Sequence, residues 1–123
     1  MSICRTTIVE YHSEADADAM TADYIANFES MFPECEKSIN SRVGPTTVVS
    51  NSVYADEAAI EKTGSGPRQA FMDKHKDRIK NVTTYIGEVT LSKLIVFGDF
   101  NHFIEFSPQT FMLIHQETFF IFL

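Results

Sequence analysis

The sequence predicts an α+β fold, in which helices pack against one antiparallel sheet, and two observations support this. Runs rich in β-branched residues alternate with helix-like patterns along residues 1–93. The β-branched run at residues 46–54 passes into a helix start at Asp56 with almost no loop. A strand that leads directly into a helix fixes the layer order of a small domain. A chain of 123 residues is long enough to bury a core without metals or disulfides.

The first two elements are a strand and a long amphipathic helix. Residues 3–11 are rich in β-branched and aromatic side chains, and neither face is purely polar, which favours a central strand covered on both sides. A helix is predicted over residues 14–32, with Ser13 as its N-cap and Pro33 at its end. Its apolar stripe consists of Ala17, Met20, Tyr24, Phe28 and Met31, widened by Ile25 and Phe32.

A hairpin is predicted next. Residues 35–43 form a polar strand, which suits a sheet edge because charged side chains discourage further pairing. Gly44-Pro45 turns the chain, and residues 46–54 return as the third strand.

A broken helix and a last strand complete the domain. The helix that begins at Asp56 is broken at Gly64-Ser65-Gly66, and a second helical segment is predicted over residues 67–80. Pro67 suits the first position of that segment. Its inner face carries Phe71, His75 and Ile79, with Met72 alongside. The fourth strand is predicted over residues 82–91.

In order, the elements are strand, helix, strand, strand, broken helix and strand, a βαββαβ sequence. This is the split βαβ arrangement of the ferredoxin-like fold. Its usual strand order places the first and third strands in the centre and the second at an edge. Cys4 and Cys35 are then separated by the third strand, so no disulfide is predicted between them.

Composition and charge exclude several classes of function. The net charge of −7 disfavours a surface that tracks phosphates, so neither nucleic acid nor an anionic membrane is an expected partner. No apolar stretch approaches the roughly 20 residues of a membrane-spanning helix. The two cysteines have no metal-like spacing, and Arg5, Thr6 and Thr7 interrupt the apolar start that a signal peptide needs. These features predict a cytoplasmic protein.

The segment 94–123 differs from the domain that precedes it. It contains eight of the eleven phenylalanines and none of the ten Lys and Arg residues. Such an apolar extension is expected to be buried, because exposed patches of this kind mark contacts or cause aggregation. Burial at a subunit interface is preferred; packing on the domain's own surface, a shifted reading frame and an unusual gene end are the alternatives.

The element order, the domain length and the pattern YADEAAIEK at residues 54–62 resemble the dimeric α/β-barrel superfamily, which includes the antibiotic-biosynthesis monooxygenases and stress-responsive barrel proteins. The resemblance covers residues 1–93. It implies a homodimer whose two four-stranded sheets face each other, with a pocket between sheet and helices in each subunit. Some members oxygenate polycyclic aromatics without a cofactor or degrade haem; others cyclise polyketides or have no assigned activity.

The chain departs from this family in its chemistry. The haem-degrading members use a tryptophan, and this sequence has none. No catalytic motif of any subfamily aligns with the chain, so no family site residue is transferred and no cofactor is expected.

Four histidines are the first candidates for chemistry. His12 follows the first strand, where a side chain can line a pocket mouth and act as a general base; the alternative is a solvated loop histidine. His75 lies on an apolar helix face and points either into the cavity or to a structural partner. His102 and His115 lie in the extension. The four show no metal-ligand spacing, so no metal is predicted.

Two charges fall inside predicted central strands. Arg5 and Glu88 lie on the first and fourth strands, which are expected to be neighbours, so the two can form a buried ion pair. Such a pair either orients a substrate carboxylate or enolate or is purely structural. Arg5 joins His12 and His75 as the candidate catalytic residues.

The candidate ligand-binding residues are polar or aromatic side chains of the strands and of the second helical segment. Ser50-Asn51-Ser52 is unusually polar for a central strand and faces either a cavity or a partner subunit. Gly64 to Arg68 precedes a helix and can bind an anion, but a simple helix break is favoured because the phosphate-loop Lys-Ser/Thr is missing. The ligand-binding candidates are Tyr11, Asn51, Tyr54, Phe71, Tyr85 and Glu88.

The sequence therefore predicts a homodimeric barrel protein that binds a lipophilic aromatic or acyl small molecule in an apolar pocket. Cofactor-independent oxygenation or cyclisation is the chemistry that the resemblance adds. The alternative is a non-catalytic binding or interaction protein of the same fold, whose phenylalanine-rich extension makes the contacts.

Overall fold

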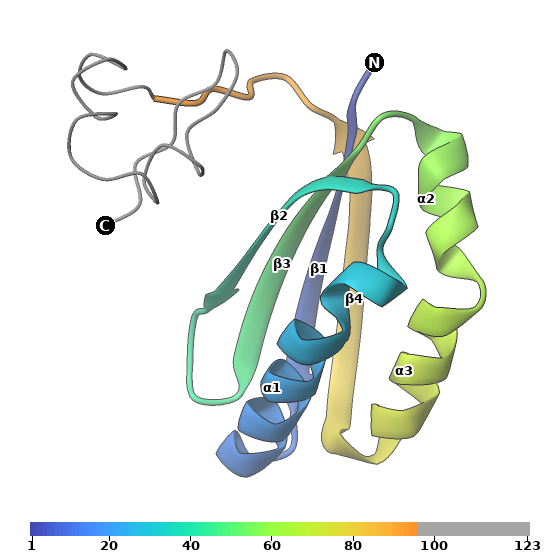
Figure 1. Cartoon of the computed structure of the whole chain (residues 1–123). Coiled ribbons are helices and arrows are strands. Elements are labelled where there is room, and N and C mark those ends of the chain that lie inside the picture. The colour runs from blue at the N-terminus through green and yellow to red at the C-terminus, as the bar shows by residue number, and fades with distance from the viewer. Residues whose placement is uncertain (96–123) are drawn as a thin grey trace, which may run out of the picture. The chain divides into compact units, whose positions relative to one another are not determined.

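The computed structural model describes residues 1–95, and the first of two compact units spans Met1–Thr90 (Figure 1). The elements of this unit follow the predicted order, with a short 3₁₀ turn added before the last strand. They are β1 (Ile3–Tyr11), α1 (Glu14–Met31), β2 (Cys35–Arg42), β3 (Thr47–Tyr54), α2 (Glu57–Gly64), α3 (Pro67–His75), the 3₁₀ turn (Lys76–Arg78) and β4 (Ile79–Glu88).

The four strands form one antiparallel sheet in the order β2-β3-β1-β4. This confirms the ferredoxin-like α+β fold, with the first and third strands in the centre. In the register, Ile3 of β1 pairs with Tyr54 of β3 and with Glu88 of β4. Cys4 and Cys35 lie on strands that β3 separates, and both are free thiols.

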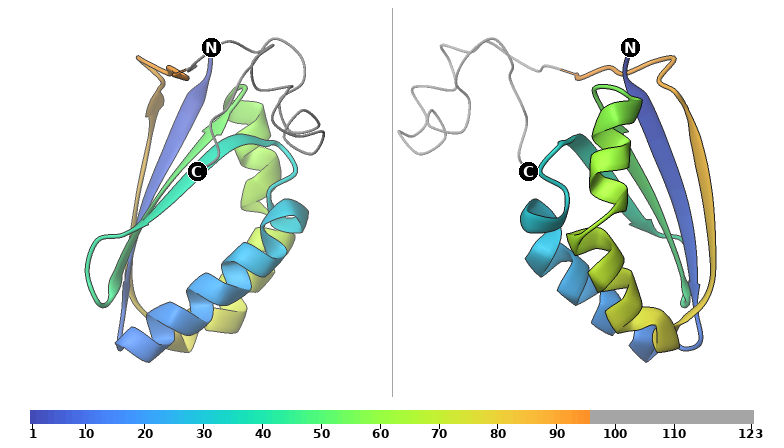
Figure 2. Two further views of the ribbon diagram at one scale, coloured as in Figure 1. Left: turned by 60° about the vertical axis from the view of Figure 1, so that its left-hand side comes forward. Right: turned by 90° about the vertical axis from the view of Figure 1, so that its right-hand side faces the viewer.

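All three α-helices lie on one face of the sheet (Figure 2). Local sequence explains where they begin. The Ser13 hydroxyl accepts a hydrogen bond from the Asp16 amide at 3.1 Å, and the Asp56 carboxylate accepts one from the Ala59 amide at 2.9 Å. Between α2 and α3, Gly66 has φ +84°, a value that favours glycine, and Pro67 then begins α3.

Two predictions within the helices were wrong. The second helical segment ends at His75 and not at residue 80, and β4 begins at Ile79, because Ile79 pairs with Tyr11 of β1 across the sheet. Ile79 is therefore a strand residue that packs on the core. Ile25, predicted to widen the buried stripe of α1, has 69% of its surface exposed, since it lies on the outer side of that helix.

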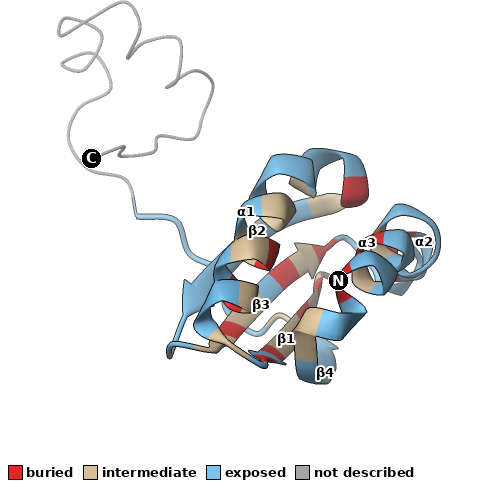
Figure 3. Cartoon of the chain, turned by 90° about the horizontal axis from the view of Figure 1, so that it is seen from below, coloured by how far each residue is buried: buried red, intermediate tan, exposed pale blue. Residues whose placement is uncertain are grey.

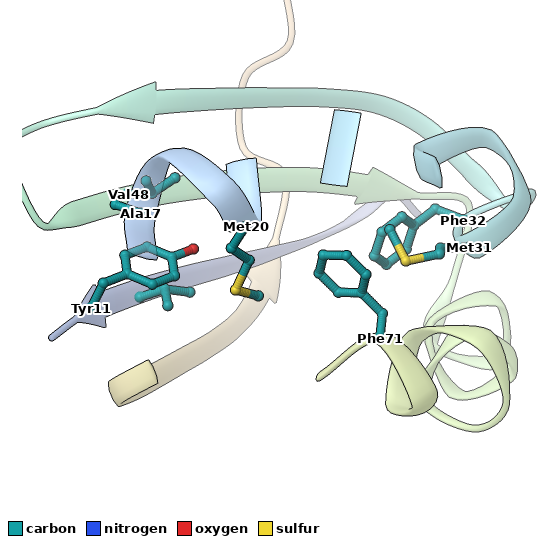
Figure 4. Packing of buried hydrophobic residues seen from close by; sticks show 8 residues of the cluster. Tyr11, Ala17, Met20, Met31, Phe32, Val48 and Phe71 are labelled. Carbon is teal, nitrogen blue, oxygen red and sulfur yellow. The ribbon is translucent and has the colours of Figure 1, made fainter. Parts of the chain in front are cut away.

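The core lies between the helices and one face of the sheet, here called the inner face (Figure 3). Alternate residues of β1, Ile3, Arg5, Val9 and Tyr11, are buried on this face. The side chains of the core converge there from β1, α1, β3 and α3 (Figure 4). Its buried members are Val9, Tyr11, Ala17, Met20, Met31, Phe32, Val48 and Phe71.

The opposite face of the sheet, here called the outer face, carries no helix of the described chain. In each strand, the residues that alternate with those of the inner face point to this side. In the β1–β3 pair, for example, Thr6 lies opposite Asn51 and Ile8 opposite Val49. Ile39 and Tyr85 on the flanking strands also belong to this face and have 59% and 62% of their surfaces exposed.

Among residues 1–95, no helix is long and apolar enough to cross a membrane. The predictions for residues 96–123 of the extension, including its burial, lie outside the described residues.

Candidate functional site

A cavity of about 60 Å³ lies between the inner face of the sheet and the helices α1 and α3. That volume holds a few water molecules, so a larger ligand requires side chains to move. Apolar and aromatic groups supply most of the walls, and a few polar groups point inward. The lining residues are Arg5, Thr7, Val9, Tyr11, Met20, Tyr24, Phe32, Asn40, Val48, Ser50, Ser52, Arg68, Phe71 and Met72.

Arg5 is the most unusual residue in this cavity, because it is a cation with only 6% of its surface exposed. Its Nη2 donates a hydrogen bond to the Tyr54 hydroxyl at 2.7 Å. The guanidinium also lies over two rings, 5.2 Å from the centre of Tyr54 and 5.9 Å from that of Phe32. Tyr54 is fully buried, and this burial raises the pKa of its hydroxyl, against the opposing effect of Arg5.

Arg68 contributes a second guanidinium from the first turn of α3. Its side chain is partly buried, and burial lowers its pKa from the usual value; the nearby charge of Arg5 lowers it further. Arg68 therefore sits in an environment that disfavours its charge.

Neutral polar groups complete the site. Ser50 and Ser52 project from β3 into the cavity, and Ser52 hydrogen-bonds through its hydroxyl to that of Ser38 at 3.1 Å. Tyr11 lines the other end, where burial raises the pKa of its phenol. Near neutral pH such a phenol is a hydrogen-bond donor and a poor base.

The predicted site residues divide between the two faces of the sheet. Arg5, Tyr11 and Phe71 line the cavity, and Tyr54 holds Arg5 through its hydroxyl. Asn51 and Tyr85 lie on the outer face, where Asn51 accepts a hydrogen bond from the Thr6 hydroxyl at 2.7 Å. For Ser50-Asn51-Ser52, alternation sends the two serines into the cavity and Asn51 to the opposite side.

The expected ion pair between Arg5 and Glu88 does not form. Across the β1–β4 register, Arg5 lies opposite Ile86, whereas Glu88 lies two residues further along, opposite Ile3. Glu88 is exposed, and Arg5 makes no ion pair with any residue of the described range 1–95.

The two described histidines lie outside the cavity. His12 is exposed after β1, where its amide donates to the carbonyl of Arg78 at 3.1 Å. His75 is buried against the Phe71 ring, and its Nε2 lies 2.6 Å from Oδ2 of Asp23. Lys74 and then His75, by hydrogen bonding to Asp23, lower the pKa of that carboxyl. His75 thus connects α3 to α1, and catalytic roles for both histidines stay predictions.

Arg68 is the residue that sequence reasoning placed in the wrong context. Its place directly after Gly64-Ser65-Gly66 suggests a loop residue, yet it precedes Phe71 and Met72 by three and four residues. That spacing puts all three on one helical face, and all three line the cavity. This spacing is the sequence signal that predicts a place for Arg68 in the cavity.

No set of three or more metal-ligating side chains comes together within residues 1–95. The chemistry that the described cavity offers is that of two cations, hydroxyl and amide dipoles, and apolar walls. A ferredoxin-like domain with an apolar cavity between its sheet and helices is the class that this fold and site define.

Comparison with known proteins supports the fold. No protein-family model matches the sequence, and no curated protein does. Among solved structures, this chain is similar to SnoaB, a cofactor-independent oxygenase from Streptomyces nogalater, with 13% identity, a TM-score of 0.60, and 74% of this chain and 95% of that one covered. NE2512 from Nitrosomonas europaea, a protein of unknown function, has 16% identity and a TM-score of 0.64 over 78% of this chain and 96% of its own.

A third similar structure comes from Chloroflexus aurantiacus and is provisionally identified as an antibiotic biosynthesis monooxygenase. It has 13% identity and a TM-score of 0.64 over 77% of this chain and 99% of its own. The likeness confirms that the chain has the fold of the antibiotic biosynthesis monooxygenase domain, as the sequence resemblance implied.

Proposed function

We propose that this protein is a cytoplasmic homodimer that binds a lipophilic small molecule, aromatic or acyl, between its sheet and helices. The observation that carries the proposal is the cavity itself. Aromatic and aliphatic side chains form most of its wall, and a small set of polar groups converges on the interior. This combination is typical of small-molecule sites.

The outer face of the sheet supports the dimer. Antiparallel sheets that face water usually present polar residues, whereas this face presents Ile8, Val49, Val53, Ile39 and Tyr85 among its polar groups. A second sheet of the same kind is a suitable cover for it, because sheets pack face to face through such side chains. Solution mass measured at micromolar concentration tests this directly, and a monomer would contradict it.

Cofactor-independent oxygenation is the reaction that this proposal favours, because Arg5 can stabilise an enolate or carbanion in an apolar site. Without a cofactor, the substrate supplies all four electrons. An activated methylene loses a proton to water, its carbanion reduces O₂ to a peroxide that takes a proton back, and loss of water from this hydroperoxide leaves a carbonyl: R₂CH₂ + O₂ → R₂C=O + H₂O. One oxygen atom enters the product and the other leaves as water.

A panel of naphthalene derivatives and fatty acyl compounds tests the binding step by ligand fluorescence or isothermal calorimetry on the full chain. Ser50→Phe fills the cavity from β3 and is expected to abolish binding. Ser41→Phe, the same change at an exposed position of β2, is the matched control and is expected to leave binding intact. If Ser50→Phe binds the panel as well as the unmutated protein, the cavity is not the site.

Turnover separates the oxygenase from the alternative, a non-catalytic binding protein. The probe is a hydroxylated anthrone, and the readouts are O₂ uptake and the absorbance of the quinone, corrected for autoxidation with heat-denatured protein. An oxygenase consumes one O₂ per quinone formed, and Arg5→Gln slows it. Binding of the panel together with no turnover of the anthrone favours the non-catalytic reading.

A further inference from the structure

The cavity has a charge imbalance that runs against the composition of the protein. The whole chain carries a net charge of −7, yet the cavity is lined by two arginines and by no Asp or Glu of the described residues. Buried or partly buried cations are normally paired, because removing a charge from water is unfavourable. The counter-charge for this pair is absent from the part of the chain that the structure describes.

Arg5 shows the imbalance most clearly. A guanidinium has five N–H donors, and the contact with the Tyr54 hydroxyl at 2.7 Å is the only hydrogen bond that the Arg5 side chain makes within residues 1–95. Its stacking on Tyr54 and Phe32 involves the faces of the rings and leaves the other N–H groups without an acceptor from those residues. Arg5 lines the cavity, so a molecule inside it can reach these donors.

Arg68 adds a second cation to the same space. It forms no ion pair in the described chain, and its charge is disfavoured both by burial and by Arg5. The remaining two arginines of the chain lie at the surface, and each forms an ion pair: Arg42 with Asp18 at 2.9 Å and Arg78 with Asp16 at 3.3 Å. The two unpaired arginines are thus the two that line the cavity.

We propose that the natural ligand is an anion, an aromatic compound with an ionised oxygen group such as a carboxylate or phenolate, held between Arg5 and Arg68. This inference rests on the proposed function and names its substrate class. The charged oxygens accept the free N–H donors and relieve the repulsion between the two guanidinium groups. The apolar walls, including Phe71 and Met20, take the aromatic skeleton. Because no Asp, Glu or His of the described residues lines the cavity to accept a proton, the site selects a ligand that is already ionised.

The test compares two probes with the same naphthalene skeleton, the anion 2-naphthoate and the neutral alcohol 2-naphthylmethanol. Each is titrated into the full chain, with naphthalene fluorescence as the readout. The unmutated protein is expected to bind the anion at least tenfold more tightly than the alcohol. Arg68→Gln is expected to reduce this ratio to below threefold. Arg42→Gln, which removes an arginine outside the cavity, is expected to leave the ratio unchanged.

Arg5→Gln is also expected to lower the ratio. Because Arg5 is buried, this change can also disturb folding, so the Arg68 variant is the decisive one. Circular dichroism checks the fold of both variants. Equal affinity for the two probes overturns the anion inference and leaves the proposed pocket standing. An unchanged ratio in Arg68→Gln removes Arg68 from the site. No binding of either probe overturns the pocket and the anion inference together.

Discussion

The two faces of the sheet carry the same backbone and very different chemistry. The inner face carries Arg5 and packs against the buried core, and the helices that cover it add Arg68 to the cavity between them. The outer face is a mixture of β-branched, aromatic and polar side chains with no helix over it in residues 1–95. Adjacent residues of one strand therefore face different environments. We expect that the proposed ligand binding and the proposed subunit contact can be altered separately.

The largest effect is expected in the core of the inner face. Phe71→Ala removes a buried ring that packs on Tyr24, with centroids 5.9 Å apart, and on His75 at 4.7 Å. Truncation of a buried Phe costs about 3–5 kcal/mol of unfolding free energy. Urea denaturation at fixed protein concentration measures the loss. Ile25→Ala, at an exposed position of α1, is the control and should change stability by no more than about 0.5 kcal/mol.

The outer face responds to a different change. Val49→Lys buries a charge in the proposed interface and is expected to weaken the dimer at least ~100-fold, equivalent to about 2.7 kcal/mol. Analytical ultracentrifugation measures the dissociation constant. Val43→Lys changes an exposed valine outside the strands and should have no effect. A dimer that tolerates Val49→Lys would place its interface elsewhere.

Removing one hydroxyl group from a tyrosine on each face compares the two faces. Tyr54→Phe removes the acceptor for Arg5 and leaves that donor unpaired, at a cost of about 1–3 kcal/mol. Tyr85→Phe makes the same change on the outer face, where the hydroxyl is exposed, and should be close to neutral in the stability of the subunit. Equal costs in denaturant titration would mean that the contact with Arg5 contributes nothing.

The smallest effect is expected at the connection between α1 and α3. Lys74 and His75 lower the pKa of Asp23 below its usual value of 3.8, so the ionised carboxyl stabilises the folded state. That stabilisation is present above the usual value and is lost as the pH falls through the lowered one. Asp23→Asn should therefore be less stable than the unmutated protein at pH 7, and the difference should shrink towards pH 3. Asp77→Asn, at an exposed carboxylate, is the control.

Much of the fold was predictable because its signals are local. Ser13 and Asp56 cap their helices as their sequence context indicates, and the strand order follows from the element order. The end of α3 was not predictable from local patterns, since the pairing of Ile79 with Tyr11 joins residues far apart in the chain. Long-range pairing overrides a helical spacing that continues past His75.

The site was harder to predict than the fold for a related reason. A strand pattern shows that Ser50 and Asn51 point in opposite directions but not which of them meets the helices. Arg5 and Glu88 do not pair because the β1–β4 register places Ile86 opposite Arg5. Glu88 lies two residues further along β4, opposite Ile3. Helical spacing places Arg68 on the same face as Phe71 and Met72 and is the only sequence signal for its position in the cavity. Its charge alone does not show whether its side chain points to solvent or to the interior.

The glycine between α2 and α3 has a consequence for the shape of the cavity. Three lining residues, Arg68, Phe71 and Met72, belong to one nine-residue helix, and the direction in which that helix leaves α2 depends on the backbone of Gly66 at φ +84°. Any other side chain there is strained, although no atom lies within 4 Å of an added Cβ. The backbone of Gly66, outside the cavity, thus orients Arg68, Phe71 and Met72 together. A substitution at Gly66 is therefore expected to change the selectivity of the proposed site without contacting its ligand.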